Sequence, residues 1–378
     1  MKNNLDGLRK SVNEIDQKII SLLEERIRVG NKIAKEKDLL NLPLTDPARE
    51  EEIIKNLTGF TTDQSLKDFI SDVYQSIFKL SKTVRSKQRH KTLPFSKVGI
   101  LGFGLIGGSI AKALRSKNPA LQIFTVRRES KSQKQALAEG YIDKTFDNLN
   151  LMAEEIDLLI LAVPIEDTLC YARDMVFIPE RKNQNKLIVI DVASVKGEIV
   201  RGFEDQTKQN IEYIGTHPMA GSEKVGFLAS RSSLFVNQPW IITPHRKNSP
   251  DSIHKIEQFI QYVGATPHVM SADKHDEVVA LISHLVFVLS VYFFDFAEST
   301  NPSSLKISGS GFESLTRLAS GSPEMHADIF TQNQKNIVRQ LQNFVNFMVK
   351  HDLTKNSYDF FTRVKKLRDE FIARKEKI

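Results

Sequence analysis

Apolar side chains recur every three or four residues through the first part of the chain, the spacing that places them along one face of an α-helix. The pattern predicts a long helix from about Asp6 to Ala34, followed by shorter helices over about 47–57 and 65–85. The long helix carries this face on Leu8, Val12, Ile15, Ile19, Leu22, Leu23, Ile27 and Ile33. Three helices bury too little apolar surface for a core of their own, so we expect this all-helical module to pair with a second copy.

Short apolar runs alternate with helical segments after a polar linker. The runs are Val98–Leu101, Leu121–Val126, Leu158–Val163, Leu187–Val192, Tyr213–Gly215 and Trp240–Thr243. This alternation predicts a doubly wound parallel sheet, and only helical patterns follow Ser271. We therefore expect a multidomain chain: an all-α module at 1–90, a linker at 91–96, an α/β Rossmann-type domain at 97–270 and an all-α dimerisation domain at 271–378.

The first apolar run ends in a glycine-rich turn. Gly102, Gly104 and Gly107 form a G-x-G-x-x-G pattern between a predicted strand and a predicted helix. In this setting the first glycine permits a tight turn, the second lets the backbone approach a pyrophosphate, and the third lets helix and strand pack closely. The alternative, a surface turn, leaves the strand and helix on either side unexplained. We expect a dinucleotide on the first helical turn, at Leu105 and Ile106.

Composition narrows the class of protein. The chain has 378 residues, 40% of them hydrophobic, enough for two or three cores. The single cysteine, Cys170, excludes an intrachain disulfide and suits the reducing cytoplasm, where we place the protein. No export signal is predicted. The apolar run 278–294 is short and contains His284, so we interpret it as a buried helix and expect no membrane partner.

The charge pattern favours a small acidic partner. The formal net charge of +7 is spread along the chain without a nucleic-acid motif, so we expect no nucleic-acid partner. No group of histidine, cysteine and acidic residues has the spacing of metal ligands, and we expect no metal.

Charged residues occur along the predicted N-terminal helices, and each alone is typical of a solvated helix face. The set is Arg9, Arg26, Lys37, Arg49, Glu50, Ser81 and Arg85. Taken in order with the surrounding apolar residues, it resembles the all-helical chorismate mutase family over residues 5–85. That family rearranges chorismate, a dicarboxylate, to prephenate without a nucleophile. Such a site has to hold the reactive conformer and stabilise charge on the breaking ether.

The resemblance implies a role for each residue of the first two helices. Arg9, reaching in from a partner subunit, binds substrate carboxylates together with Arg26 and Arg49, since the guanidinium fork matches a carboxylate. Lys37 donates to the ether oxygen. Glu50 binds the ring hydroxyl.

The third helix adds Ser81 and Arg85 to the same implied site. Arg85 stands where the family has glutamine or glutamate, and Gln88 lies one turn further on. A donor to the ether oxygen survives this difference, but the pH dependence of the site is left open.

Four motifs follow the glycine turn. They are residues 191–197 (DVASVKG), 216–223 (THPMAGSE), 282–285 (ISHL) and 309–317 (GSGFESLTR). Together they resemble the prephenate/arogenate dehydrogenase family over residues 97–346. This family oxidises and decarboxylates a cyclohexadienol, and its product is aromatic. The first module would then make the acid that the second consumes.

The resemblance implies a catalytic set of four residues. His217, at a predicted strand end, accepts the ring hydroxyl proton. Ser194 hydrogen-bonds to that histidine and the substrate, and Arg317 anchors a carboxylate. His284 has a supporting role. The alternatives are a histidine before Pro218 that only caps the chain, a serine helix cap, a surface arginine ion pair and a core histidine.

Two departures from the family concern closure of the substrate pocket. Glu313-Ser314 replaces a basic and acidic pair, and His326 stands where a tryptophan is usual. These differences leave open the contact that Glu223 would make in the pocket.

The second strand of the Rossmann-type domain bears on cofactor choice. An acidic residue at its end accepts the ribose hydroxyls in NAD sites, whereas NADP sites supply arginine for the 2′-phosphate. Here Thr125 stands at that position, followed by Arg127 and Arg128. We therefore expect NADP in preference to NAD. The alternative is that Glu129 takes the ribose and that both arginines face solvent.

The sequence thus predicts a cytoplasmic, homodimeric, bifunctional enzyme of tyrosine biosynthesis. It would convert chorismate to prephenate and then, with NADP or NAD, prephenate to 4-hydroxyphenylpyruvate. Two alternatives remain open: an arogenate dehydrogenase that gives tyrosine directly, and a dehydrogenase whose helical module is a non-catalytic dimerisation or regulatory element.

Overall fold

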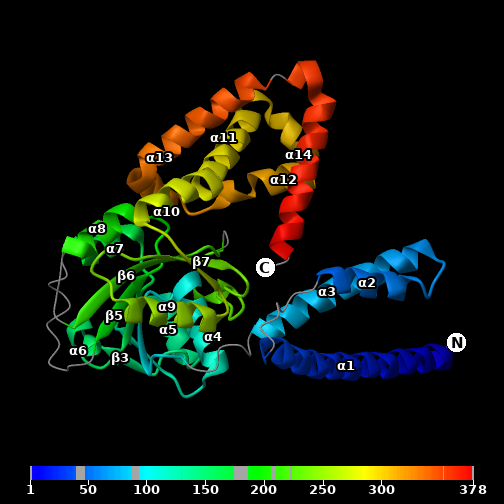
Figure 1. Ribbon diagram of the computed structural model, residues 1–378, viewed down its shortest axis with the longest axis horizontal. Helices are drawn as coiled ribbons and strands as arrows, with labels where there is room; N and C mark the ends of the chain where they lie inside the picture. The colour runs from blue at the N-terminus through cyan, green and yellow to red at the C-terminus, as the bar shows by residue number, and fades with distance from the viewer. Residues whose placement is uncertain are drawn as a thin grey trace. The chain divides into compact units, whose positions relative to one another are not determined.

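The computed structural model describes residues 2–39, 47–86, 93–128, 130–173, 186–205, 210–221, 224–351 and 353–376 (Figure 1). The chain divides into two compact units, one of residues 1–91 with 353–378 and the other of residues 92–352. The expected fold class is confirmed: helices at the N-terminus, a Rossmann-type sheet in the middle and helices after it.

The first unit is all-helical. Its helices are α1 (Lys2–Leu39), α2 (Pro47–Thr58), α3 (Gln64–Ser86) and α14 (Leu353–Glu376). α3 contacts both α1 and α2, and Phe78 of α3 is buried. The apolar face of α1 is exposed to between 49% and 64% at Leu8, Val12, Ile15, Ile19 and Leu22. A face of this kind, with steps of four and three residues, fits a facing helix.

The second unit is built on an eight-stranded sheet of order β3-β2-β1-β4-β5-β6-β7-β8. The strands are β1 (Lys97–Leu101), β2 (Gln122–Val126), β3 (Lys144–Phe146), β4 (Leu158–Leu161), β5 (Leu187–Asp191), β6 (Ile211–Pro218), β7 (Pro239–Thr243) and β8 (Thr266–Val269). The helices between them are α4 (Leu105–Lys117), α5 (Lys131–Ala138), α6 (Leu149–Ala153), α7 (Ile165–Arg173), α8 (Gly197–Asp205) and α9 (Pro250–Val263).

One strand differs from the expected all-parallel sheet. β7 runs antiparallel to β6, with His217 opposite Ile241. A parallel return needs a crossover helix. In the described part of the β6–β7 connection the helical element is a three-residue turn, η2 (Phe227–Ala229). The sequence pattern also missed the short strands β3 and β8, because neither has an uninterrupted apolar run.

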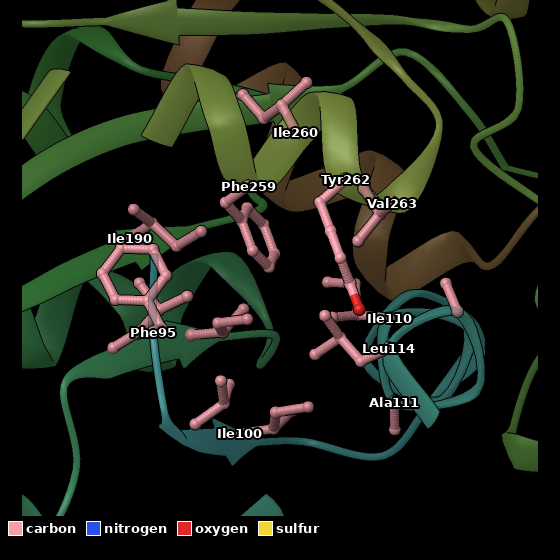
Figure 2. Close-up of a cluster of buried hydrophobic side chains, with 14 of the residues drawn as sticks. Phe95, Ile100, Ile110, Ala111, Leu114, Ile190, Phe259, Ile260, Tyr262 and Val263 are labelled. Carbon is pink, nitrogen blue, oxygen red and sulfur yellow. The ribbon is translucent and has the colours of Figure 1, made fainter. Parts of the chain in front are cut away.

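Helices cover both faces of the sheet, each with its own apolar core. α4 and α9 pack on one face, where Figure 2 shows side chains of both helices turned toward the strand residues Ile100 and Ile190. α6, α7 and α8 cover the other face. Short sequence signals fix the helix ends. α9, for example, begins with a Ser249 cap and Pro250 and ends at Gly264, whose φ is 98°.

The helical part of the second unit follows β8. It comprises α10 (Ala272–Val279), a π-helical turn η3 (Ala280–His284), α11 (Leu285–Thr300), η4 (Pro302–Ile307), α12 (Ser310–Thr316), η5 (Arg317–Ser320) and α13 (Pro323–Lys350). α10 contacts the helix α8 and the strand β7 of the Rossmann-type domain, and it also contacts α13. This docking brings the helical part to the carboxyl ends of β5 and β6.

Candidate functional site

The glycine turn after β1 has the geometry of a dinucleotide site. Gly102 has a φ of +94°, and a Cβ there would lie 2.2 Å from the Ala162 carbonyl oxygen. A Cβ on Gly107 would lie 2.0 Å from the carbonyl oxygen of Gly102, whereas no atom of the described residues lies within 4 Å of a Cβ on Gly104. The first and third glycines are thus required by packing, and the second leaves open space above the turn.

The amides of the following helix complete this site. Gly104 is the N-cap of α4 and supplies no side-chain hydrogen bond, and Leu105 and Ile106 are the first helical residues. The N-terminal amides of a helix bind anions, because they lack intrahelical partners and lie at the positive end of the helix dipole. The turn therefore fits a dinucleotide pyrophosphate.

Thr125 does not face the ribose side of this site. Its side chain is 1% exposed, and its hydroxyl donates to the Ile100 carbonyl at 2.7 Å. The expectation that this hydroxyl bonds to a 2′-phosphate therefore does not fit the geometry. Arg127 and Arg128 do project to the surface, with loose ion pairs to Asp147 at 3.7 Å and to Asp167 at 3.8 Å. Glu129 lies outside the described residues.

His217 lies near the end of β6 and is 8% exposed. Its Nδ1 is 2.9 Å from Nε2 of His275 on α10, and Nδ1 of His275 is 2.8 Å from Oδ1 of Asp276. The two histidines are 58 residues apart in sequence and meet because α10 docks on the sheet edge. A row of His217, His275 and Asp276 results.

Asp276 also joins α10 to the start of α8. Its carboxylate accepts from the backbone amides of Lys196 and Gly197, each at 2.8 Å. A Cβ on Gly197 would lie 2.9 Å from Oδ2 of Asp276, so glycine permits this approach. Burial raises the pKa of Asp276, but the hydrogen bonds from His275 and these two amides outweigh it and leave the pKa below its ordinary value.

A buried ion pair lies beside the histidine. Lys196 bonds to Asp191 at the end of β5, and both side chains are fully buried. Asp191 also accepts from the Tyr213 hydroxyl at 2.8 Å and from the amides of Thr216 and Ala193 at 3.1 and 3.0 Å. These bonds satisfy the carboxylate, as a buried charge requires. The motif 191–197 is thereby fixed against β6.

His217 is held in its neutral form. Burial lowers its pKa well below 6.5. Electrostatic repulsion from His275, Lys196 and His284, when these groups are protonated, lowers the pKa further. A neutral imidazole in a buried position can accept a proton from a substrate hydroxyl at neutral pH.

His284 ends the π-helical turn, a feature that is frequent at functional sites. Its Nδ1 lies 3.2 Å from the Nδ2 amide of Asn333, which also donates to the Asp276 carbonyl at 2.8 Å. The amide only donates, so Nδ1 accepts and the hydrogen of the neutral ring lies on Nε2. Burial lowers the pKa of His284 to about 4.

Nε2 of His284 is buried without a hydrogen-bond partner among the residues that the structure describes. The Ser194 backbone carbonyl is near enough to oppose the fall in the pKa of His284, but does not complete a hydrogen bond. His284 and the Ser194 loop are thus brought together, with a donor available between them. Asn333 itself has non-helical backbone angles within α13 (φ −121°, ψ 20°).

The structure also describes two further predicted residues of this unit, Arg317 and His326. Arg317 begins η5 and is exposed. His326 stacks on Phe287, with ring centroids 3.4 Å apart, at a cavity of about 40 Å³ that His284 also lines. That volume suits water rather than substrate. Glu223 lies outside the described residues.

The structure describes some of the residues predicted for the mutase site in the helical module. Arg26 on α1 lies over the Phe78 ring of α3, 5.3 Å from its centroid, and Glu50 is half-buried. Arg9 pairs with Asp6 at 3.5 Å and Arg49 with Glu52 at 2.6 Å; all four side chains are exposed. The side chains of Lys37, Ser81 and Arg85 lie outside the described residues.

Comparisons with known families cover most of the chain. Residues 110–269 match the model of the prephenate dehydrogenase nucleotide-binding domain, and residues 271–367 match that of the prephenate dehydrogenase dimerization domain. The chain belongs to the prephenate dehydrogenase family. Residues 8–86 match chorismate mutase type II, so a mutase domain precedes the dehydrogenase. Both resemblances inferred from the sequence are confirmed.

Individual relatives agree with these matches. The chain is 29% identical to prephenate dehydrogenase of Bacillus subtilis over 280 residues, which are 71% of this chain and 74% of that one. It is 24% identical to the T-protein of Enterobacter agglomerans over 350 residues, 89% of this chain and 84% of that one.

Solved structures of the family share the fold. Prephenate dehydrogenase from A. aeolicus, in complex with hydroxyphenyl propionate and NAD+, aligns with a TM-score of 0.65 at 25% identity over 75% of this chain and 99% of that one. Synechocystis arogenate dehydrogenase aligns with a TM-score of 0.59 at 25% identity, over 74% and 99%.

Sequence reasoning missed His275, Asp276 and Asn333. The available signal for the first two was a His-Asp pair in a charged stretch shortly before the apolar run 278–294. Asn333 lies on a polar stretch of α13, and no sequence signal distinguished it from its neighbours.

Proposed function

We propose that the chain rearranges chorismate to prephenate in its helical module and then oxidatively decarboxylates prephenate to 4-hydroxyphenylpyruvate, toward tyrosine. The observation that carries the dehydrogenase part is the neutral, buried His217 at the carboxyl edge of the sheet that also bears the glycine turn. The test is to supply chorismate as sole substrate with NADP+. Reduced nicotinamide should accumulate only if both activities are present.

His217 acts as the base in this proposal. Its Nε2 takes the proton of the ring hydroxyl while the bound nicotinamide supplies the acceptor for the hydride from the same carbon. Loss of the ring carboxylate as carbon dioxide leaves a phenolate, and His217 returns its proton to that oxygen. The substrate is therefore converted to a phenol and carbon dioxide, its hydride is transferred to the nicotinamide, and no proton is released overall.

His284 and Ser194 orient the substrate. The buried Nε2–H of His284 is an unsatisfied donor, and a substrate oxygen placed there would restore the hydrogen bond that burial removes. Ser194 lies in the loop after β5, between Asp191 and Lys196, and its backbone is close to His284. Both residues hold the ring hydroxyl or a carboxylate rather than exchange protons.

Arg317 anchors a substrate carboxylate in this proposal. We expect Arg317→Ala to raise KM by roughly 10- to 100-fold with a smaller change in kcat, because a charge-assisted contact present in both ground and transition states is lost. Steady-state kinetics with prephenate measures this. Arg246→Ala, which removes an exposed arginine paired with Glu204, is the control. An unchanged KM in Arg317→Ala would remove Arg317 from the pocket.

We propose NADP as the preferred cofactor. Arg127 and Arg128 are exposed, and their present ion pairs exceed 3.5 Å, so a phosphate can replace these contacts at little cost. The backbone below them is fixed: the Arg128 amide donates to Gln133 at 2.6 Å, and Gln133 donates to the Val126 carbonyl at 2.7 Å. The preference rests on these arginines and not on the buried hydroxyl of Thr125.

Replacing both arginines tests the cofactor. The double variant Arg127→Ala/Arg128→Ala should raise KM for NADP by roughly 10- to 100-fold and leave KM for NAD nearly unchanged, because only the 2′-phosphate is affected. Arg246→Ala again serves as the control. A wild-type efficiency with NAD equal to or above that with NADP, insensitive to these substitutions, would contradict the proposal.

The mutase site is proposed to form between two chains. Arg9 and Arg26 lie 17 positions apart on one continuous helix, about 25 Å along its axis, too far to share one small substrate within a chain. A second α1, packed on the exposed face of Leu8, Val12 and Ile15, would bring its own Arg9 to the Arg26 end. Arg49 and Glu50 on α2 then serve the carboxylate and the ring hydroxyl.

The helical part of the dehydrogenase gives a second contact between chains. Large apolar side chains of α11 are exposed there, with Tyr292 at 64%, Phe293 at 42% and Phe296 at 65%. An exposed apolar surface of this kind marks an interface, and it lies within the match to the dimerization domain. We propose a homodimer in which this face is covered.

We propose a cytoplasmic protein without a membrane or nucleic-acid partner. By length and composition, Ala272–Thr300 is the one membrane-span candidate among the helices that the structure describes. Its first part, however, buries His275, Asp276 and His284 in the hydrogen-bonded site. These polar groups suit a core helix rather than a lipid-facing one.

Prephenate is preferred to arogenate in this proposal, since it is the direct product of the fused mutase. Comparing kcat/KM for the two substrates decides between them.

A further inference from the structure

We infer that His275 and Asp276 are positioning residues that fix the tautomer of His217, so that Nε2 is the nitrogen left free to accept a proton. The inference rests on the proposed role of His217 as base. It adds two residues to the site that act on substrate only through His217.

The direction of the hydrogen bonds starts at Asp276. Its carboxylate receives two backbone amides, from Lys196 and Gly197, which can only donate. The same Oδ1 that accepts from Lys196 lies 2.8 Å from Nδ1 of His275. Because an ionised carboxylate only accepts, Nδ1 of His275 carries the hydrogen.

The position of the hydrogen on His275 then decides which atom donates in its bond to His217. A neutral His275 with its hydrogen on Nδ1 presents a lone pair at Nε2. Nδ1 of His217 lies 2.9 Å from that lone pair, so His217 has to donate from Nδ1. The remaining nitrogen of His217, Nε2, then holds a lone pair, which is the requirement for a base.

The same row stabilises the protonated base. Once His217 accepts a proton it bears a positive charge in a buried site, and a positive charge on His275, Lys196 or His284 disfavours it. His275 can therefore support the protonated His217 only as a neutral ring. The hydrogen bond to Nε2 of His275, backed by the Asp276 carboxylate, supplies the opposing polarity. In hydrolase triads a carboxylate orients the catalytic histidine and stabilises its protonated form. Here Asp276 would act in the same way on His217, through His275.

Asp276 has a structural duty besides this one, since it accepts from the first amides of α8. His275 is therefore the better residue to vary. Phenylalanine at this position keeps a planar ring but no acceptor. Glutamine can place its Oε1 near the position of Nε2 and accept from Nδ1 of His217.

The experiment compares His275→Phe with His275→Gln in the full chain. We expect His275→Phe to lower the dehydrogenase kcat by at least about 10²-fold, the lower range for loss of effective acid–base catalysis. His275→Gln should stay within about tenfold of the wild type, the scale of one altered hydrogen bond. His245→Phe removes a half-buried histidine outside the row and should leave kcat unchanged.

A second readout reports the tautomer itself. In chains labelled with ¹⁵N-histidine, His217→Asn identifies the His217 signals among those of nine histidines. We expect the wild type and His275→Gln to hold the Nδ1–H form, and His275→Phe to shift toward a mixture. If His275→Phe fails to fold, His275→Asn carries the same contrast, because its shorter side chain does not reach His217.

Three outcomes would overturn the inference: equal losses in the Phe and Gln variants, an unchanged tautomer in His275→Phe, or a full further loss when His275→Phe is added to His217→Asn. The last follows because a residue that acts through His217 has little left to lose in its absence. Failure of the proposed function is distinguishable, since it would appear as near-normal turnover in His217→Asn alone.

Discussion

Replacing His217 with asparagine is expected to lower the dehydrogenase kcat by roughly 10²- to 10⁴-fold, the usual contribution of general acid–base catalysis. Asparagine keeps a polar group near Nδ1, and so a hydrogen bond toward His275, but has no basic nitrogen where Nε2 stands. NADP affinity should remain within a few-fold of the wild type, because the glycine turn belongs to β1 and α4. Single-turnover hydride transfer to NADP+ is the direct measurement.

The matched control is His245→Asn, at a half-buried histidine of the same unit that bonds to the Tyr213 carbonyl at 3.1 Å. It should retain activity and mutase turnover. Near-normal dehydrogenase turnover by His217→Asn would mean that this histidine is structural and that another group takes the proton.

The dependence of dehydrogenase activity on pH tests the same role of His217. The base must be neutral, so activity is present above the pKa of His217 and is lost as pH falls through it. Burial places that pKa well below 6.5, and kcat/KM should therefore stay flat as pH falls from 8 through 6.5. The protonated form is the one that burial penalises, so this histidine also favours unfolding as pH falls below its unfolded-state pKa of about 6.5.

Arg26→Ala is expected to lower mutase turnover by roughly 10²- to 10³-fold, the loss typical when one preorganised donor to developing charge is removed. Arg26 lies over Phe78, the buried residue that joins α3 to α1, which holds its guanidinium at one place along the helix. Lys37→Ala should have a comparable effect through loss of the donor to the ether oxygen. The fall in chorismate absorbance measures both.

The control is Arg28→Ala, which removes an exposed arginine two positions away, on another side of α1. It should leave the mutase intact. Dehydrogenase activity on supplied prephenate should persist in all three variants, since Arg26 and His217 belong to separate compact units. Equal losses of both activities in Arg26→Ala would contradict independent sites, and full mutase activity would favour a non-catalytic helical module.

Local signals sufficed for much of this protein. The helical spacing of Leu8, Val12 and Ile15 predicted α1, and the buried runs in β1, β4 and β5 predicted the sheet, because periodicity and burial are properties of neighbouring residues. The glycine turn was equally readable. Gly102 and Gly107 have no room for a Cβ, so the backbone itself dictates the residue type.

The order and direction of strands required the three-dimensional structure at one place. β7 is antiparallel, and an apolar run of five residues contains no information about which way its neighbour runs. The sequence likewise placed Thr125 correctly at the end of β2, but could not tell that its hydroxyl would turn inward to the Ile100 carbonyl.

By itself, the sequence determined the two families and the glycine turn and singled out His217 as a candidate, because each depends on residue types at fixed short spacing. Tertiary structure alone decided the surroundings of His217: α10 brings His275 and Asp276 from 58 and 59 positions away, and α13 brings Asn333 to His284 across 49 positions. Hydrogen bonds between such distant residues exist only once the helices dock on the sheet edge. These hydrogen bonds, and the burial that lowers the pKa of His217, are therefore properties of the folded chain.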